Sequence, residues 1–117
     1  MGDETPGRTP QSSIDTKAIE PLVRRIRDTF SPLQVWLLGS RARGAAHPSS
    51  DWDLAIVVPD DADDSVFDPR ATWRTLRQDL FQADVAMFPK SEFEEDRSTP
   101  NTLPFAVTRE GVLLYER

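Results

Sequence analysis

Two aspartates separated by a single residue, Asp51 and Asp53, open the most strand-like segment of the 117-residue chain. Side chains of a β-strand alternate between its two faces, so both carboxylates are expected on one face and Trp52 on the other. Neighbouring carboxylates repel each other, and a divalent cation between them removes that repulsion. The pair therefore predicts a metal site. The alternative interpretation is a strand end that emerges into water.

A glycine and a serine, Gly39 and Ser40, follow a short apolar run at residues 34–38 and precede two arginines, Arg41 and Arg43. A strand that ends in Gly-Ser and leads into a short helix presents free backbone N–H groups and a hydroxyl at the helix N-terminus. Such an arrangement binds phosphate, and the arginines add positive charge beside it. Taken alone, the pattern equally fits a plain turn with two solvated arginines.

A third acid, Asp84, lies near the start of another apolar stretch, residues 83–88. Burying a carboxylate costs free energy unless a partner compensates its charge. If this stretch is a strand beside residues 51–58, its carboxylate would converge with those of Asp51 and Asp53 on one site. If it is an edge strand instead, Asp84 would point outward into water.

The order and spacing of these residues resemble the nucleotidyltransferase superfamily of DNA polymerase beta, most closely its minimal stand-alone members. The family pattern is a Gly-Ser pair followed about ten residues later by Asp-x-Asp, with a third carboxylate downstream. Here it reads LGSRARG over residues 38–44, SDWDL over residues 50–54, and then Asp84. The ending REGVLLYER at residues 109–117 is also typical of the minimal members. The resemblance extends from about Ile19 to the C-terminus.

The resemblance implies a role for each candidate. The residues that would hold the triphosphate of ATP are Gly39, Ser40, Arg41 and Arg43. The catalytic and metal-binding residues would be the three aspartates, Asp51, Asp53 and Asp84. The first two would bind two Mg²⁺ ions, and Asp84 would share one ion and help to deprotonate the attacking hydroxyl. The ions would stabilise the attacking and leaving oxygens of an in-line displacement at the α-phosphate, which releases pyrophosphate.

The resemblance also implies a partner. Minimal members are commonly encoded beside a small helical HEPN-domain ribonuclease, with which they form a toxin–antitoxin pair. The nucleotidyltransferase is then the antitoxin, and it transfers AMP from ATP to a tyrosine of the toxin. Two alternatives stay open: a non-catalytic antitoxin that neutralises its partner by binding, and the catalytic subunit of an enzyme that modifies a small molecule such as an aminoglycoside.

Helices and strands alternate along the segments that must position these residues. Residues 1–13, rich in Pro, Gly, Ser and Thr, predict a disordered tail before a single domain at residues 14–117. A helix that becomes regular near Pro21 is predicted by apolar residues at every fourth position, namely Ala18, Leu22, Ile26 and Phe30.

The later elements are predicted in the same way. Strands are expected at residues 34–38, 51–58, 83–88 and 112–115. Helices are expected from Pro69 to about Phe81, after a cap at Ser91, and over residues 103–110 before Gly111. The alternation favours an α/β (α+β) fold, a small mixed β-sheet flanked by helices. The resemblance implies the polymerase beta-like nucleotidyltransferase fold.

Charge and composition narrow the class of protein. Twenty acidic residues against fourteen basic ones give a formal charge of −6. Proteins that grip long nucleic acid usually carry a basic surface, so a direct nucleic-acid partner is disfavoured. The absence of cysteine excludes disulfides, a thiolate zinc site and a cysteine nucleophile. No apolar run reaches the roughly 18 residues of a membrane span and no signal peptide is evident, so we expect a cytoplasmic protein.

Three other features are assigned structural roles. His47 is the single histidine, and without a second one a zinc site has little support. The aspartate-rich residues 60–68 lack the central Gly and the closing Glu of an EF-hand loop, and we expect a solvated loop. Trp36, Trp52 and Trp73 are expected in the core.

Overall fold

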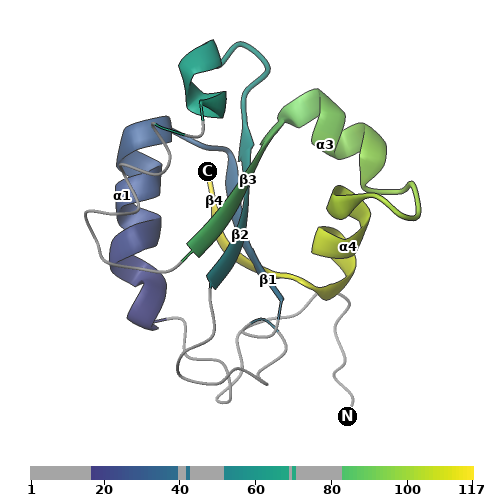
Figure 1. The fold of residues 1–117 in the computed structure, drawn as a ribbon, viewed down its shortest axis with the longest axis horizontal. Coiled ribbons are helices and arrows are strands. Elements are labelled where there is room, and N and C mark those ends of the chain that lie inside the picture. Colours follow the sequence, from purple (N-terminus) through teal and green to yellow (C-terminus); the bar gives the residue numbers. More distant parts are fainter. Residues whose placement is uncertain (1–16, 40–41, 43–51, 69, 71–82) are drawn as a thin grey trace.

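The computed structural model describes residues 17–39, 42, 52–68, 70 and 83–117 (Figure 1). Its elements are η1 (Lys17–Ile19), α1 (Glu20–Phe30), β1 (Gln34–Leu38), β2 (Trp52–Val58), η2 (Asp64–Phe67), β3 (Ala83–Pro89), α3 (Lys90–Asp96), α4 (Leu103–Glu110) and β4 (Val112–Glu116). The strands form one sheet in the order β3-β2-β1-β4, in which β2 and β3 are parallel and the other pairs antiparallel. Helix α1 lies on one face, and α3 and α4 lie on the other. The predicted mixed sheet flanked by helices is confirmed.

Strand β2 supplies apolar side chains to both faces of the sheet. On the α1 side, Leu54 and Ile56 pack against residues of that helix such as Leu22 and Ile26. On the α3–α4 side, the buried cluster consists of Trp36, Ala55, Val57, Phe88, Phe93 and Val107. Because a strand that is covered on both faces buries every side chain, its sequence is a continuous apolar run, and residues 54–58 contain no polar residue.

The start of α1 differs in one position from the sequence prediction. Leu22, Ile26 and Phe30 are buried as expected, but Ala18 is exposed and Ile19 is buried in its place. Residues Lys17–Ile19 form a 3-10 turn, whose repeat is three residues, so the spacing of an α-helix does not extend through them. The α-helix itself begins at Glu20, with Pro21 in its first turn, as predicted.

Helix α3 is capped by a residue from another part of the chain. The prediction that Ser91 caps this helix is wrong, because α3 begins at Lys90 and Pro89 occupies the N-cap position without a side-chain bond. The backbone N–H of Ser91 instead donates to Oδ1 of Asp60, at 2.8 Å. Parallel pairing brings the ends of β2 and β3 together, so the loop after β2 lies beside the first turn of α3.

The aspartate-rich segment at residues 60–68 is exposed, as predicted, and its own carboxylates order it. Oδ1 of Asp63 accepts a hydrogen bond from the N–H of Ser65 at 2.9 Å and caps η2. Hydrogen bonds from the backbone and side chain of Ser65 lower the pKa of the Asp63 carboxyl below its usual value. Val66 packs against the α1-side core, so this loop is attached to the domain.

The C-terminal elements agree with the sequence prediction. Helix α4 spans the predicted residues, Thr102 caps it through its side chain, and Gly111 ends it. A Cβ at Gly111 would lie 2.5 Å from the carbonyl oxygen of Val107, which explains the glycine. Trp36 and Trp52 are buried as expected.

The remaining predictions concern residues 1–13, His47 and the helix at 69–81 with Trp73, of which the structure describes residue 70 alone. Within the part of the chain that the structure describes, no helix is long and apolar enough to cross a bilayer.

Candidate active site

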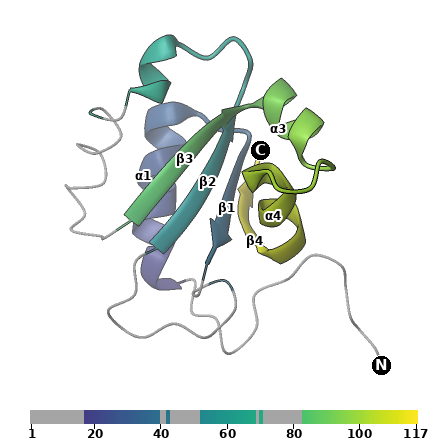
Figure 2. The same ribbon diagram turned by 45° about the vertical axis from the view of Figure 1, so that its right-hand side comes forward.

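Three of the candidate residues lie at one end of the sheet. In the parallel β2–β3 pair, Asp53 stands directly opposite Asp84. In the antiparallel β1–β2 pair, Asp53 stands opposite Leu38, the residue that precedes Gly39. Strand β1 therefore ends where β2 and β3 begin (Figure 2), and Gly39, Asp53 and Asp84 come from three neighbouring strands at that end.

Both carboxylates project from the α3–α4 face of the sheet. Asp53 shares a face with Ala55 and Val57, which belong to the buried cluster beneath those helices, and Trp52 packs on the α1 side. The alternation expected around Trp52 is thus confirmed for this half of the pair. Asp53 is half-buried and Asp84 is exposed, because β3 is the edge strand. Asp84 thus faces water and adjoins Asp53, and its place in a common site with Asp51 stays a prediction.

Gly39 lies against the Asp53 side chain. Its φ of +80° is a left-handed conformation that side-chain-bearing residues rarely adopt. A Cβ at this position would collide with Oδ2 of Asp53 and would lie 3.3 Å from its Cγ. The N–H of Ala42 donates to the Gly39 carbonyl at 3.1 Å. Only glycine lets the backbone pass this close to the carboxylate.

Replacing Gly39 by alanine is expected to lower the free energy of unfolding by about 1–3 kcal/mol, because strained backbone and a side-chain collision act together. Urea denaturation of the purified chain measures the loss. Gly39→Asn separates the two causes, since asparagine tolerates the left-handed conformation but still carries a Cβ. Equal losses in both variants would identify the collision with Asp53 as the dominant cause. An unchanged midpoint for Gly39→Ala would contradict the prediction.

The other candidates, Ser40, Arg41, Arg43 and Asp51, lie outside the described residues. Among residues 17–39, 52–68 and 83–117, no group of three or more acids or histidines is placed to hold a metal ion. The described part of the site is therefore a pair of carboxylates beside a glycine turn. Carboxylate oxygens are ligands that Mg²⁺ prefers, so the donor chemistry of this pair fits that ion.

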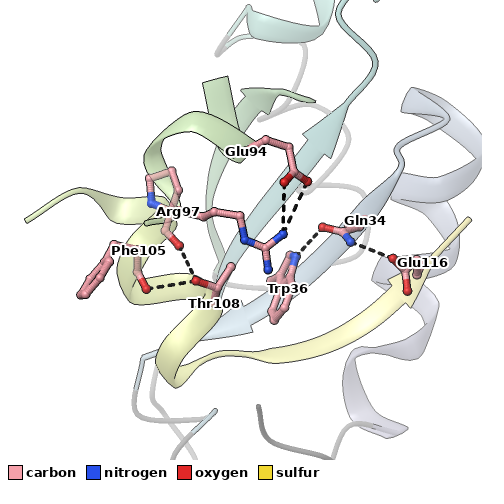
Figure 3. Close-up of polar contacts among 8 residues, drawn as sticks. Gln34, Trp36, Glu94, Arg97, Phe105, Thr108 and Glu116 are labelled. Atoms are coloured by element: carbon pink, nitrogen blue, oxygen red, sulfur yellow. Dashed lines mark hydrogen bonds and ion pairs between the residues drawn. The ribbon is translucent and has the colours of Figure 1, made fainter. Parts of the chain in front are cut away.

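A polar network at the opposite end of the sheet was not predicted (Figure 3). The indole N–H of Trp36 donates to Oε1 of Gln34 at 3.0 Å, and Nε2 of Gln34 donates to Oε2 of Glu116 at 2.9 Å. Gln34 and Glu116 are also paired across β1 and β4. These bonds fix the amide of Gln34 and help to set the register of the two strands. The partners are 82 residues apart, so no local sequence pattern indicates the contact.

The family comparison agrees with this fold. Residues 20–117 match the family described as "Polymerase beta, Nucleotidyltransferase". The match covers most of the chain, and the protein belongs to this nucleotidyltransferase family.

Solved structures share the fold at low sequence identity. A candidate nucleotidyltransferase from Sulfolobus solfataricus is 25% identical with a TM-score of 0.56, over 86% of this chain and 79% of that one. A toxin–antitoxin complex with AMP-PNP is 22% identical with a TM-score of 0.57, over 84% and 73% of the two chains. A mutant MntA–HpeT toxin–antitoxin is 22% identical with a TM-score of 0.54, over 84% and 72%. None of the curated proteins compared with the chain matches it.

Proposed function

We propose that the protein is a Mg²⁺-dependent nucleotidyltransferase that transfers AMP from ATP to a tyrosine hydroxyl of a partner HEPN toxin, for which it acts as the antitoxin. The observation that carries the proposal is the placement of Asp53 opposite Asp84, with Gly39 against the first carboxylate, in a chain of this family. Two of the structures that share the fold are toxin–antitoxin proteins, and one of them contains AMP-PNP, which supports the choice of nucleotide and partner.

In this proposal the residues keep the roles that the resemblance implies. Asp51, Asp53 and Asp84 would hold two Mg²⁺ ions, which supply positive charge to the attacking and leaving oxygens. The residues that would hold the triphosphate are Gly39, Ser40, Arg41 and Arg43. The chain's contribution is positioning, since the strands fix the carboxylates before the substrates bind.

Because Asp84 is exposed, it is suited to accept the proton of the attacking hydroxyl. A carboxylate on the edge strand is accessible to a hydroxyl that a second protein brings to the site. Asp84 would take the hydroxyl proton while the oxygen bonds to the α-phosphorus. The bond from that phosphorus to the oxygen that bridges the α- and β-phosphates then breaks, and pyrophosphate leaves.

The charge of the chain supports a protein acceptor of opposite charge. A formal charge of −6 favours association with a basic surface, and an RNA-cleaving partner needs such a surface to hold its substrate.

The proposal is tested by the intact mass of the neighbouring gene's product after incubation with this protein and Mg-ATP. We expect a gain of whole AMP units, which chelation of Mg²⁺ abolishes. Asp84→Asn should slow the gain by about 10²-fold, the contribution of a positioned proton acceptor. Asp61→Asn is the matched control, because it also removes one exposed aspartate, at the opposite end of β2, and it should leave the rate unchanged.

Other outcomes distinguish the alternatives. A stable complex without any mass gain would contradict transfer and would favour neutralisation by binding. Transfer to an aminoglycoside, with none to the protein, would favour the small-molecule enzyme. Equal effects of Asp84→Asn and Asp61→Asn on the rate of mass gain would show that Asp84 does not belong to the site.

A further inference from the structure

A groove of about 260 Å³ separates α1 from the edge strand β4. Its apolar lining consists of Ile19, Val23, Leu114 and Tyr115. The groove lies on the α1 face of the sheet, whereas Asp53 and Asp84 project from the α3–α4 face. It is therefore separate from the candidate active site.

An irregularity in β4 builds the apolar lining. Val35 and Trp36 are consecutive on β1, but their partners on β4 are Tyr115 and Leu113, so Leu114 is an extra residue in the pairing. Consecutive side chains of a regular strand would point to opposite faces, yet Leu114 and Tyr115 both pack on the α1 side. A β-bulge re-aims side chains in this way. Two large apolar side chains thus face the groove where a regular strand would supply one.

The rim of the groove is charged. It is formed by three exposed residues of α1, Glu20, Arg24 and Arg27, with one negative and two positive charges. Nε of Arg27 also contacts Oδ1 of Asp28, at 3.2 Å. Asp28 offsets part of the charge of Arg27, and the two arginines of the rim favour an acidic occupant in a chain with a formal charge of −6.

The same chain carries a segment with the complementary features, which we call the acidic loop (residues 60–68). Its side chains include five aspartates and Phe67, which is 38% exposed. Hydrogen bonds from Ser91 to Asp60 and from Ser65 to Asp63 hold the loop in place. The loop therefore presents a fixed aromatic side chain surrounded by negative charge. Aromatic side chains of this kind are common anchors of protein interfaces.

We propose that the groove receives the acidic loop of a second copy of this chain. Phe67 would enter the apolar lining, with Asp64 and Asp68 near the arginines of the rim. Phe67 is exposed and is not part of the lining of its own groove, so the contact must form between two molecules. In Figures 1 and 2, η2 lies beyond one end of α1, so the loop and the groove flank the same helix. In a dimer with a two-fold axis, each copy would place its acidic loop in the groove of the other copy. Both grooves would then be filled, and no further copy could join.

Sedimentation or light scattering of the full chain over a range of concentrations tests the association. We expect the mass to rise from 13.2 kDa towards twice that value. Phe67→Ala and Arg24→Glu should each raise the dissociation constant of the dimer at least about tenfold, because the first removes the anchor and the second removes charge complementarity. Leu103→Ala and Arg109→Glu are the matched controls, because they remove an exposed apolar side chain and reverse an exposed positive charge on α4, away from the loop and the groove. Thermal denaturation verifies that each variant is folded.

A disulfide cross-link tests which surfaces meet, since the chain has no cysteine of its own. Chains with Ser65→Cys in the loop and Glu20→Cys at the rim both retain Phe67 and Arg24. Mixed under mild oxidation, they should form a covalent dimer faster than Ser65→Cys mixed with Ser98→Cys, an exposed position near the end of α3.

Three results would overturn the proposal. The first is a wild-type chain that stays monomeric at all concentrations, which would leave the groove to a different protein. The second is a dimer that resists both Phe67→Ala and Arg24→Glu. The third is a cross-link that forms no faster than in the Ser98→Cys mixture. None of these measurements involves nucleotide transfer, so they are independent of the proposed function.

Discussion

Replacing Asp53 by asparagine is expected to lower AMP transfer by about 10³-fold or more, in line with the loss of one preorganised charge at a reacting phosphate. Asparagine keeps the shape of the side chain, so the contact with Gly39 is preserved and only the charge is lost. The rate of mass gain of the acceptor measures the effect. Transfer by Asp53→Asn at the wild-type rate would show that the metal site has been assigned to the wrong residues.

The same variant is expected to remain folded and to lose its response to Mg²⁺. Asp53 and Asp84 are like charges on neighbouring strands, so the substitution relieves their repulsion, and asparagine keeps the shape of the side chain. An ion that binds the folded state raises the melting temperature, and this increase should disappear in Asp53→Asn. Asp61→Asn should retain the increase. The pair of melting curves thus separates loss of the metal site from loss of the fold.

Replacing Phe93 by alanine is expected to lower the free energy of unfolding by about 3–5 kcal/mol. Phe93 is fully buried. Its ring packs edge-on against Phe88, with 5.8 Å between centroids, and is tilted against Trp36, with 6.4 Å between centroids. It is the buried residue by which α3 is attached to the sheet. Typical domains have a total stability of about 5–15 kcal/mol, so this loss could unfold a large fraction of the protein.

Urea denaturation measures that loss, and Phe105→Ala is the matched control. Phe105 is a half-buried phenylalanine on α4, and the guanidinium of Arg109 lies 4.4 Å above its ring. Its removal should cost only about 1 kcal/mol, the contribution of such a contact near the surface. Similar losses in the two variants would contradict the assignment of Phe93 as the main anchor of α3.

Elements with strong local patterns were predictable from the sequence. Strand β1 and helix α4 have the predicted limits. Strand β1 is an apolar run with turn residues at both ends, and helix α4 lies between a capping residue, Thr102, and a terminating glycine, Gly111. The signals for both elements are therefore local. The cap of α3 was not predictable. The carboxylate that accepts the Ser91 N–H belongs to Asp60, 31 residues earlier, and only the pairing of β2 with β3 brings it there. The bulge at Leu114 likewise has no local signal.

The sequence predicted a set of candidate site residues but not their geometry. Spacing and family resemblance predicted Gly39, Asp53 and Asp84 together, and the structure places these three at one end of the sheet. The register that sets Asp53 opposite Asp84 is a non-local property of two strands. The sequence suggested that Gly39 allows a phosphate to approach, whereas the structure adds that it makes room for Asp53. The roles of all seven candidate residues stay predictions, and Ser40, Arg41, Arg43 and Asp51 lie outside the described residues.

The pairing of β1 with β4 also has a consequence for how the chain folds. Gln34 and Glu116 are held together across 82 residues, so this pairing closes a far longer loop than the β1–β2 pairing does. Long-range strand pairing of this kind slows folding, because chain entropy is lost before the contacts form. We therefore expect β4 to join the sheet late. Its amide hydrogens should exchange with solvent through partial opening events, before those of β2 in the centre of the domain.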